Sequence, residues 1–472
     1  MRLIVFSTVL LACGGSLRSD GGEASHGLTD GIHYEIRVDA TLSRMWVKTC
    51  FDGETPSVLE PMTSQAVDLL GEAYGDQGQV LPLTDDRKID LSRLGIGECV
   101  RYDVDLEVAG WSRQAVRQGR DLMVTQALFL WRPPEWDPSI RVAIDMDLPR
   151  GMHVSTAWPR TRRGDVVMFR PDRSVIKTVG NVVFMTSPPL HVEVGTTRAE
   201  IAVLDGPLHV GRRGVERWLR EALRAASTMH GRFHTDHLHI AVLPIGPGWR
   251  PVAFGMVRRG GGPSVMLLVH ENADEEELVS DWTAVHELSH LGLPRMYNED
   301  RWISEGFATY YQEVLRARAG LIPPEKAWEN MAAGFARGAY SGSRGPLWRD
   351  AANFRGVGRI YWAGTAYMLD TDVRYRQRQG SLDDLVRRYL PEWTSTTDAW
   401  HGLDCTASLD RIFGSPLSQP LARNYGRMRR YPDTEALLRQ LGVESGIGRS
   451  VTLNDRAPLA GIRRAITEPL EN

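Results

Sequence analysis

The fold of this chain is decided by the segment Asp281-Trp-Thr-Ala-Val-His286-Glu287-Leu-Ser-His290-Leu, which contains the pattern His-Glu-x-x-His. On a helix, His286 and His290 lie one turn apart on one face, so both imidazoles can bind one zinc ion with Glu287 beside it. The alternative is that the two histidines only pack on a buried helix face. Because three defined residues at this spacing are rare in a chain with 13 His, we predict a metal site.

The residues around the motif predict one helix over residues 274–291. Asn272 can cap its N-terminus, and Glu275 follows three residues later, as in a capping box. Apolar side chains recur at helical spacing, at Leu278, Trp282 and Val285. Pro294 predicts the end of this helix, because proline cannot continue one.

A third metal ligand is expected from the stretch Trp302-Ile-Ser-Glu305-Gly-Phe-Ala-Thr-Tyr-Tyr311, in which Glu305 follows His290 by fourteen residues. Two histidines and one glutamate leave the fourth tetrahedral position for water, which is typical of catalytic zinc sites. The alternative for Glu305 is a surface carboxylate in the first turn of a helix, where the helix dipole favours a negative charge.

These two stretches together resemble the gluzincin metallopeptidases, which have a thermolysin-like catalytic domain. Further along the chain come Tyr361-Trp-Ala-Gly364-Thr-Ala-Tyr-Met-Leu-Asp370, Arg374 and Ser381-Leu-Asp-Asp-Leu385. In this order they resemble the glycyl aminopeptidase family in particular. The resemblance covers roughly residues 235–390.

The resemblance implies a role for five residues. His286, His290 and Glu305 would bind zinc, one ion per chain. Glu287 would activate the zinc-bound water as general base, and Tyr361 would stabilise the oxyanion of the tetrahedral intermediate. For Tyr361, an aromatic side chain that only packs within a helix remains the alternative.

One departure from the family concerns the substrate's free α-amine. Related aminopeptidases carry a Gly-Gly-Leu-Glu-His-like edge strand whose Glu holds that amine, whereas Phe254-Gly-Met-Val-Arg258-Arg259 contains no acid here. The two arginines would repel an ammonium group and attract a carboxylate, so we expect N-blocked peptides to be better substrates. Another acid, Glu271 or Glu299, could restore amine binding.

The N-terminal residues predict export. Arg2 and the mostly apolar stretch Leu3–Leu11 are typical of a secretory signal peptide, residues 1–12, and this stretch is too short to span a bilayer. Leu10-Leu-Ala-Cys13 resembles the lipobox of bacterial lipoproteins, which implies a lipid anchor at Cys13. The alternative is a plain signal peptide. We expect an exported bacterial lipoprotein, periplasmic or anchored to the outer membrane, with residues 13–31 as a flexible tether.

The remaining sequence predicts an α+β protein. Its 472 residues, 42% of them hydrophobic, suit two or three globular domains, and the net charge of −3 argues against nucleic acid as a partner. The expected order is a β-rich, antiparallel N-terminal domain (32–198), a thermolysin-like zinc peptidase domain (199–398) and a short helical C-terminal region (399–472). Strands are expected at His237–Leu243, Val252–Val257 and Val265–Val269, and helices at Gly214–Met229, Arg301–Ala319, Glu325–Arg337 and Gly358–Arg378.

Three classes of function are consistent with these features. The first is a zinc metallopeptidase, a hydrolase acting on a peptide or protein substrate. The others are a catalytically idle, lipid-anchored binding protein that keeps the fold, and a zinc hydrolase of a non-peptide substrate.

Cys50 and Cys99 could pair in an oxidising compartment, and Cys405 is expected to be a buried thiol. The sequence does not indicate an oligomeric state.

Overall fold

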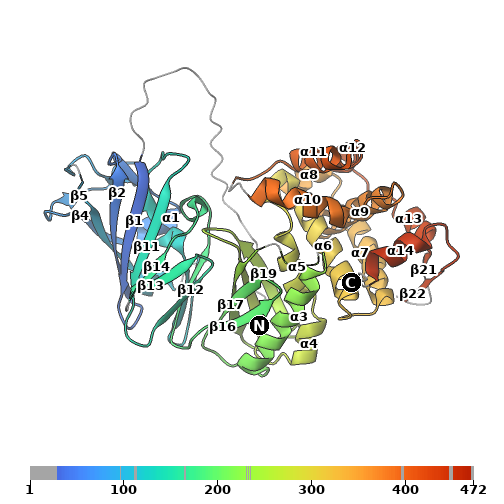
Figure 1. The fold of residues 1–472 in the computed structure, drawn as a ribbon, viewed down its shortest axis with the longest axis horizontal. Helices are drawn as coiled ribbons and strands as arrows, with labels where there is room; N and C mark the ends of the chain where they lie inside the picture. Colours follow the sequence, from blue (N-terminus) through green and yellow to red (C-terminus); the bar gives the residue numbers. More distant parts are fainter. Residues whose placement is uncertain are drawn as a thin grey trace, which may run out of the picture.

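A computed structural model describes residues 29–468, except for 96, 111–113, 164–165, 230, 232, 234, 395–397 and 446–449. Figure 1 shows a β-rich N-terminal part beside a part that combines one sheet with many helices, which confirms the α+β class. The expected signal peptide and Cys13 lie outside the described residues. Within them, no helix is both long enough and apolar enough to cross a membrane.

The N-terminal part is built around an eight-stranded sheet in the order β13-β14-β11-β1-β2-β7-β4-β5. Side chains of β1 alternate between core and solvent, as expected for a half-buried strand, with Ile32, Tyr34 and Ile36 buried. Among the described strand pairs of this part, only β1 with β11 is parallel, so the antiparallel prediction is wrong there. The strands of this sheet are β1 (Thr29–Val38), β2 (Arg44–Gly53), β4 (Leu70–Gly75), β5 (Val80–Leu81), β7 (Val100–Asp105), β11 (Arg141–Asp147), β13 (Arg160–Arg163) and β14 (Val166–Phe169).

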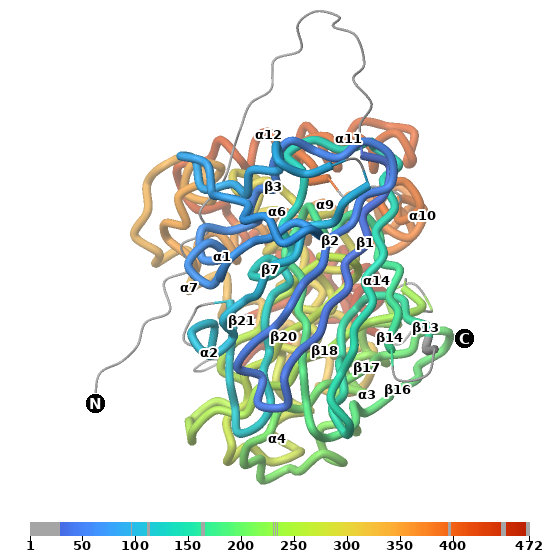
Figure 2. Tube along the Cα trace, turned by 90° about the vertical axis from the view of Figure 1, so that its left-hand side faces the viewer, coloured from blue at the N-terminus to red at the C-terminus, as the bar shows by residue number. Residues whose placement is uncertain are grey.

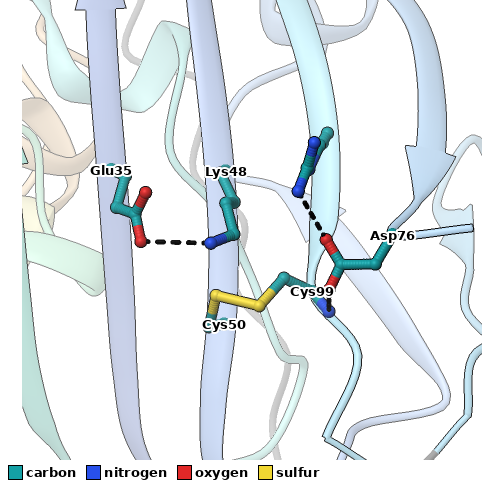
Figure 3. Close-up of a disulfide and its surroundings, with 6 residues drawn as sticks. Glu35, Lys48, Cys50, Asp76 and Cys99 are labelled. Atoms are coloured by element: carbon teal, nitrogen blue, oxygen red, sulfur yellow. Dashed lines mark hydrogen bonds and ion pairs between the residues drawn. A yellow bond between two sulfur atoms is a disulfide. The ribbon is translucent and has the colours of Figure 1, made fainter.

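Two smaller sheets and a disulfide complete this part. One sheet has the order β12-β15-β9-β8 and the other β10-β3-β6. Cys50 of β2 and Cys99, directly before β7, form a disulfide beside the ion pair of Glu35 and Lys48 (Figure 3). The strands are β3 (Val58–Pro61), β6 (Ile89–Asp90), β8 (Ala115–Gln118), β9 (Asp121–Thr125), β10 (Trp131–Arg132), β12 (His153–Thr156) and β15 (Asn181–Met185).

The second part contains a five-stranded sheet in the order β16-β17-β18-β20-β19. Its strands are β16 (Leu190–Val194), β17 (Thr197–Val203), β18 (His237–Ile245), β19 (Val252–Arg258) and β20 (Ser264–His270). The expected strands coincide with β18, β19 and β20 within two residues. The expected domain boundary at residue 198 falls inside β17, although β16 already pairs with this sheet. A two-stranded sheet, β21 (Val443–Ser445) and β22 (Val451–Leu453), lies near the C-terminus.

Helices pack against one face of this sheet and continue into the C-terminal region. Among the described residues, the α-helices are α1 (Ser64–Leu69), α2 (Leu106–Ala109), α3 (Gly211–Ser227), α4 (Glu275–Ser280), α5 (Thr283–His290), α6 (Arg301–Arg318), α7 (Pro324–Ala339), α8 (Leu347–Ala352), α9 (Val357–Arg376), α10 (Leu382–Thr394), α11 (Gly402–Phe413), α12 (Ser418–Arg427), α13 (Glu435–Leu441) and α14 (Ala460–Thr467). One large apolar core joins the sheet to α3 and the helices that follow it, whereas α1 and α2 belong to the separate core of the N-terminal part.

The single helix expected over 274–291 is wrong, because the chain forms α4 and α5 with a break at Asp281. Asp281 has an extended backbone (φ −69°, ψ 143°), and its carboxylate accepts a hydrogen bond from the Thr283 amide, which starts the new helix. The N-cap of α4 is Asp274, in a capping box with Glu277. The expected cap, Asn272, bonds instead to the backbone of Gly248.

The other face of the five-stranded sheet is covered by the N-terminal part. An apolar layer joins Met123 and Met185 of the four-stranded sheet to Leu243 and Met266 of the five-stranded sheet. Figure 2 shows strands of the N-terminal part in front of β17, β18 and β20. Hydrogen bonds hold the segment after β19 to the N-terminal part. The amides of Arg259 and Gly260 donate to the Val179 carbonyl, and Trp158 Nε1 donates to the Gly260 carbonyl at 2.8 Å.

Candidate metal centre and active site

Helices α5 and α6 bring the three expected metal ligands together. Nε2 of His286 lies 3.5 Å from Oε2 of Glu305, and Nε2 of His290 lies 3.4 Å from the same oxygen. One ligand atom from each residue lies within 4.8 Å of the others. The two imidazoles project from one face of α5, one turn apart, as the spacing predicts.

Two hydrogen bonds fix the orientation of the imidazole rings. Nδ1 of His286 lies 2.8 Å from Oε1 of Gln312, and Nδ1 of His290 lies 3.1 Å from Oγ of Ser304. Each contact leaves Nε2 free to face Glu305. Neither partner was predicted from the sequence. Their positions relative to Glu305 could have indicated them: Ser304 directly precedes Glu305, and Gln312 follows it by two helical turns on the same face.

The chemistry of this cluster fits a zinc ion. Oε2 of Glu305 is buried and has no hydrogen-bond partner among the described residues, which is costly for a carboxylate unless a cation faces it. Burial opposes its ionisation, but the neighbouring His290 and His286 hold the pKa of Glu305 below its usual value. Two imidazole nitrogens and one carboxylate oxygen are ligands that zinc prefers.

Glu287 lies next to the ligands but points toward the edge strand. Its side chain is only 7% exposed, and burial raises its pKa. Gly255 of β19 lies against it: a Cβ atom at Gly255 would come within 2.5 Å of Cγ of Glu287. The absence of a side chain at position 255 therefore lets the edge strand approach the candidate base.

Tyr361 reaches the site from α9. Its ring stacks on that of His286, with 6.0 Å between the centroids and 7° between the planes. Burial and the neighbouring carboxylates of Glu305 and Glu287 raise its pKa well above the usual range, so the hydroxyl stays protonated. Tyr361 therefore lies at the metal centre, unlike an aromatic residue that only packs in the core.

The position of Tyr361 depends on a close crossing of α6 and α9 at two glycines. A Cβ atom at Gly364 would lie 2.0 Å from the Trp302 carbonyl oxygen, and one at Gly306 would lie 2.2 Å from the Gly364 carbonyl carbon. Gly306 follows Glu305 directly, and Gly364 lies one turn after Tyr361. The crossing thus sets the distance between a metal ligand and the tyrosine.

The two arginines after Val257 do not share one environment. Nη2 of Arg259 donates to the carbonyls of His290 and Leu293, each at 2.8 Å, so Arg259 ties the edge strand to the end of α5. Arg258 has no such contact among the described residues. Of the two acids expected as substitutes for the amine anchor, Glu299 lies in a separate cluster with Asp300 and His401, and Glu271 follows β20.

Comparisons with known proteins agree with this geometry. The profile of the M61 glycyl aminopeptidase family matches residues 293–365. Among solved structures, an aminopeptidase N family protein from Idiomarina loihiensis is 14% identical with a TM-score of 0.68, and the alignment covers 87% of this chain and 78% of that one. A comparison with curated protein sequences finds no significant match.

Two further structures show the same fold at lower scores. An M1 zinc metallopeptidase mutant from Deinococcus radiodurans, bound to a Tyr-Ser-Ala substrate, is 15% identical with a TM-score of 0.55, over 86% of this chain and 95% of that one. Yeast LTA4 hydrolase is 11% identical with a TM-score of 0.52, over 88% of this chain and 70% of that one. At these identities the structures show similarity of fold.

The protein is a zinc metallopeptidase. The family match, the shared fold and the His-Glu-x-x-His centre support a hydrolase of this kind, and its matched residues resemble those of the glycyl aminopeptidases. In this peptidase the matched residues 293–365 include Glu305, Tyr361 and Gly364 but not α5. The likeness in the family profile and the geometry of α5 are therefore independent observations.

Proposed function

We propose that the peptidase hydrolyses peptide bonds with one zinc ion held by His286, His290 and Glu305. The observation that carries the proposal is the convergence of the Nε2 atoms of His286 and His290 on one buried carboxylate oxygen of Glu305, beside the second buried carboxylate of Glu287. Among the described residues this cluster contains three ligands, the number typical of a catalytic rather than a structural zinc site.

The proposed mechanism assigns one proton path and one hydrogen bond to the protein. Zinc bound here would polarise the substrate carbonyl and lower the pKa of the attacking water. Glu287 accepts the proton of that water and then donates it to the leaving amine; its raised pKa makes it a stronger base than an exposed glutamate. Tyr361, protonated at neutral pH, donates a hydrogen bond to the oxyanion on the attacked carbonyl carbon.

We further propose that the peptidase acts outside the cytoplasm, as an exported lipoprotein anchored to a membrane at Cys13. This proposal depends on the N-terminal sequence, which lies outside the described residues. The disulfide of Cys50 and Cys99 supports an oxidising compartment. A peptide or protein in that compartment would be the substrate.

The test compares three forms of the protein that start at residue 28: wild type, His286→Ala and Glu287→Gln. Wild type should contain one zinc per chain and cleave an N-blocked peptide, and His286→Ala should lose both properties. Glu287→Gln should keep its zinc but lose activity by about 10²–10⁴-fold, because only proton transfer is removed. Metal analysis and a cleavage assay measure both quantities.

Two results would contradict the proposal. Zinc content that is unchanged in His286→Ala would remove the metal assignment. Zinc-loaded wild-type protein that binds peptides without cleaving them would favour the alternative of a catalytically idle binding protein. Activity that Glu287→Gln retains at the wild-type level would show that another group is the base.

A further inference from the structure

A row of polar side chains crosses the five-stranded sheet on the face that the N-terminal part covers. The strand pairing places the residues of this row next to one another in the order His191, Glu200, His239, Ser264 and Arg258, one from each strand. The neighbouring row contains apolar residues such as Ala241 and Met266. A polar row inside an otherwise apolar interface requires partners for each of its charges.

The interior of this row has partners from the N-terminal part. Glu200 is 3% exposed, and it pairs with Arg160 at 2.7 Å and accepts a hydrogen bond from Ser155 at 2.8 Å. Ser264 lies 2.9 Å from Nδ1 of His239 and accepts a hydrogen bond from Asn181 at 3.0 Å. The charge of Glu200 is therefore neutralised within the protein.

Arg258, at the edge of the row, is different. Its guanidinium makes no hydrogen bond and no ion pair with any described residue, and its Nε atom is buried. Burial lowers the pKa of Arg258 to about 10, so the group is still charged at neutral pH. Two other buried atoms of this neighbourhood, His239 Nε2 and Asn181 Oδ1, also lack a partner among the described residues.

The Arg258 side chain is partly exposed, but its buried Nε atom has lost water without gaining a partner, which costs free energy unless an anion binds the group. Arg259 differs from Arg258, because two backbone carbonyls accept hydrogen bonds from its guanidinium and give it a structural role. No described acid does this for Arg258. The candidate partner of Arg258 is therefore an anionic group of a bound ligand.

The position of Arg258 relative to the metal centre indicates which ligand. β19 is the last strand of its sheet, so its outer edge has unpaired backbone groups to which an extended peptide can add as a strand. Gly255 of the same strand lies against Glu287. Arg258 follows three residues later, roughly 10 Å along the strand, on the opposite face from Gly255.

We propose that Arg258 binds a carboxylate of the substrate, and that the peptidase prefers peptides with an acidic side chain two or three residues from the cleaved bond. This inference rests on the proposed function. A peptide paired with β19 presents alternate side chains to the two faces of the sheet, and those on the Arg258 face meet the only unpaired cation of the polar row. The neighbouring Arg259 takes no part in this recognition, because its guanidinium is already bonded to α5.

The test uses N-acetylated, C-amidated peptides in which each of the three positions on either side of the cleaved bond carries Asp, Asn, Glu or Gln. Wild type should show kcat/KM roughly ten to a hundred times higher for the acid than for the amide at one position, the range of a charge-assisted hydrogen bond. Arg258→Met should abolish this preference, so that the ratio of kcat/KM between the acid and the amide peptide falls to about one. Arg250→Gln, which removes an exposed arginine just before β19, should keep it.

A preference that is absent in wild type, or that persists in Arg258→Met, would overturn the inference while peptide cleavage still supports the proposed function. If no peptide is cleaved, the proposed function fails, and calorimetric binding of the acid and amide peptides to the zinc-loaded protein tests the inference separately. The midpoint of thermal unfolding adds a structural control: Arg258→Met should unfold at the same temperature or higher, because an unpaired, partly buried charge is removed. A lower midpoint would show that Arg258 has a structural role instead.

Discussion

Replacement of Gly364 by alanine tests whether the crossing of α6 and α9 positions the active site. The new Cβ atom would lie 2.0 Å from the Trp302 carbonyl oxygen, whereas ordinary contacts begin near 3.4 Å, so the helices must separate by about 1.4 Å. Because the obstacle is backbone, a rotamer change cannot relieve it. Overpacking of this kind costs about 1–3 kcal/mol, and a displacement of about 1 Å in an active site can cost 10²-fold in rate.

We therefore expect Gly364→Ala to lose about 1–3 kcal/mol in the free energy of unfolding and, at saturating zinc, about 10²-fold in kcat. Urea unfolding followed by circular dichroism gives the first quantity and cleavage of an N-blocked peptide gives the second. The matched control is Gly358→Ala in the first turn of the same helix, where the nearest atoms to a Cβ lie 4.0 Å away. This variant should be as stable as wild type or more stable, by up to about 1 kcal/mol, and fully active.

Wild-type stability and kcat in Gly364→Ala would refute the reasoning, because the helices would then tolerate a side chain at the crossing. A loss of stability with unchanged kcat would be equally informative. It would show that the two helices separate without moving Tyr361 from the metal centre.

The remaining predictions concern the metal affinity and the cysteines. Gln312→Met removes the acceptor that orients His286, so the Kd for zinc, measured by competition with a chelator, should rise about 10–100-fold with little change in kcat at saturating zinc; an unchanged Kd would mean that packing alone orients the ring. Burial raises the pKa of the Cys405 thiol to about 12, so the native protein from residue 28 should not react with a thiol reagent at pH 8. In denaturant without reductant one thiol per chain should react, and three would contradict the disulfide of Cys50 and Cys99.

Local periodicity predicted the long helices around the site well. The expected helix 301–319 corresponds to α6, Arg301–Arg318, and the helix expected at 358–378 corresponds to α9, Val357–Arg376. Each combines helical periodicity with many buried apolar residues, so the pattern is unambiguous. The break between α4 and α5 was missed, because the same pattern continues through Asp281 and only the backbone conformation there separates the two helices.

The environment of each arginine on the edge strand could not be predicted from sequence. Neighbouring residues in a strand face opposite sides of a sheet, so Arg258 and Arg259 must lie in different environments. Which of the two faces the metal centre depends on the register of β19 with β20, and the sequence does not give that register. The partners of Arg259 are the carbonyls of His290 in α5 and of Leu293 just after it, and the polar row that ends at Arg258 begins at His191, 67 residues earlier in the chain. Such long-range placement has no signal in local composition or periodicity.

Because residues 259–261 are attached to the N-terminal part, we expect the two parts of the protein to be inherited together. The Val179 carbonyl and the Trp158 ring hold the chain directly after β19, and the backbones of Gly180 and Gly260 approach so closely that a Cβ at either would clash within 2.4 Å. A catalytic domain transferred alone to another protein would lose this anchor of its own edge strand. Recombination among relatives should therefore preserve the two parts as one unit, and chimaeras joined near residue 190 should be active only when both sides of this contact come from the same parent.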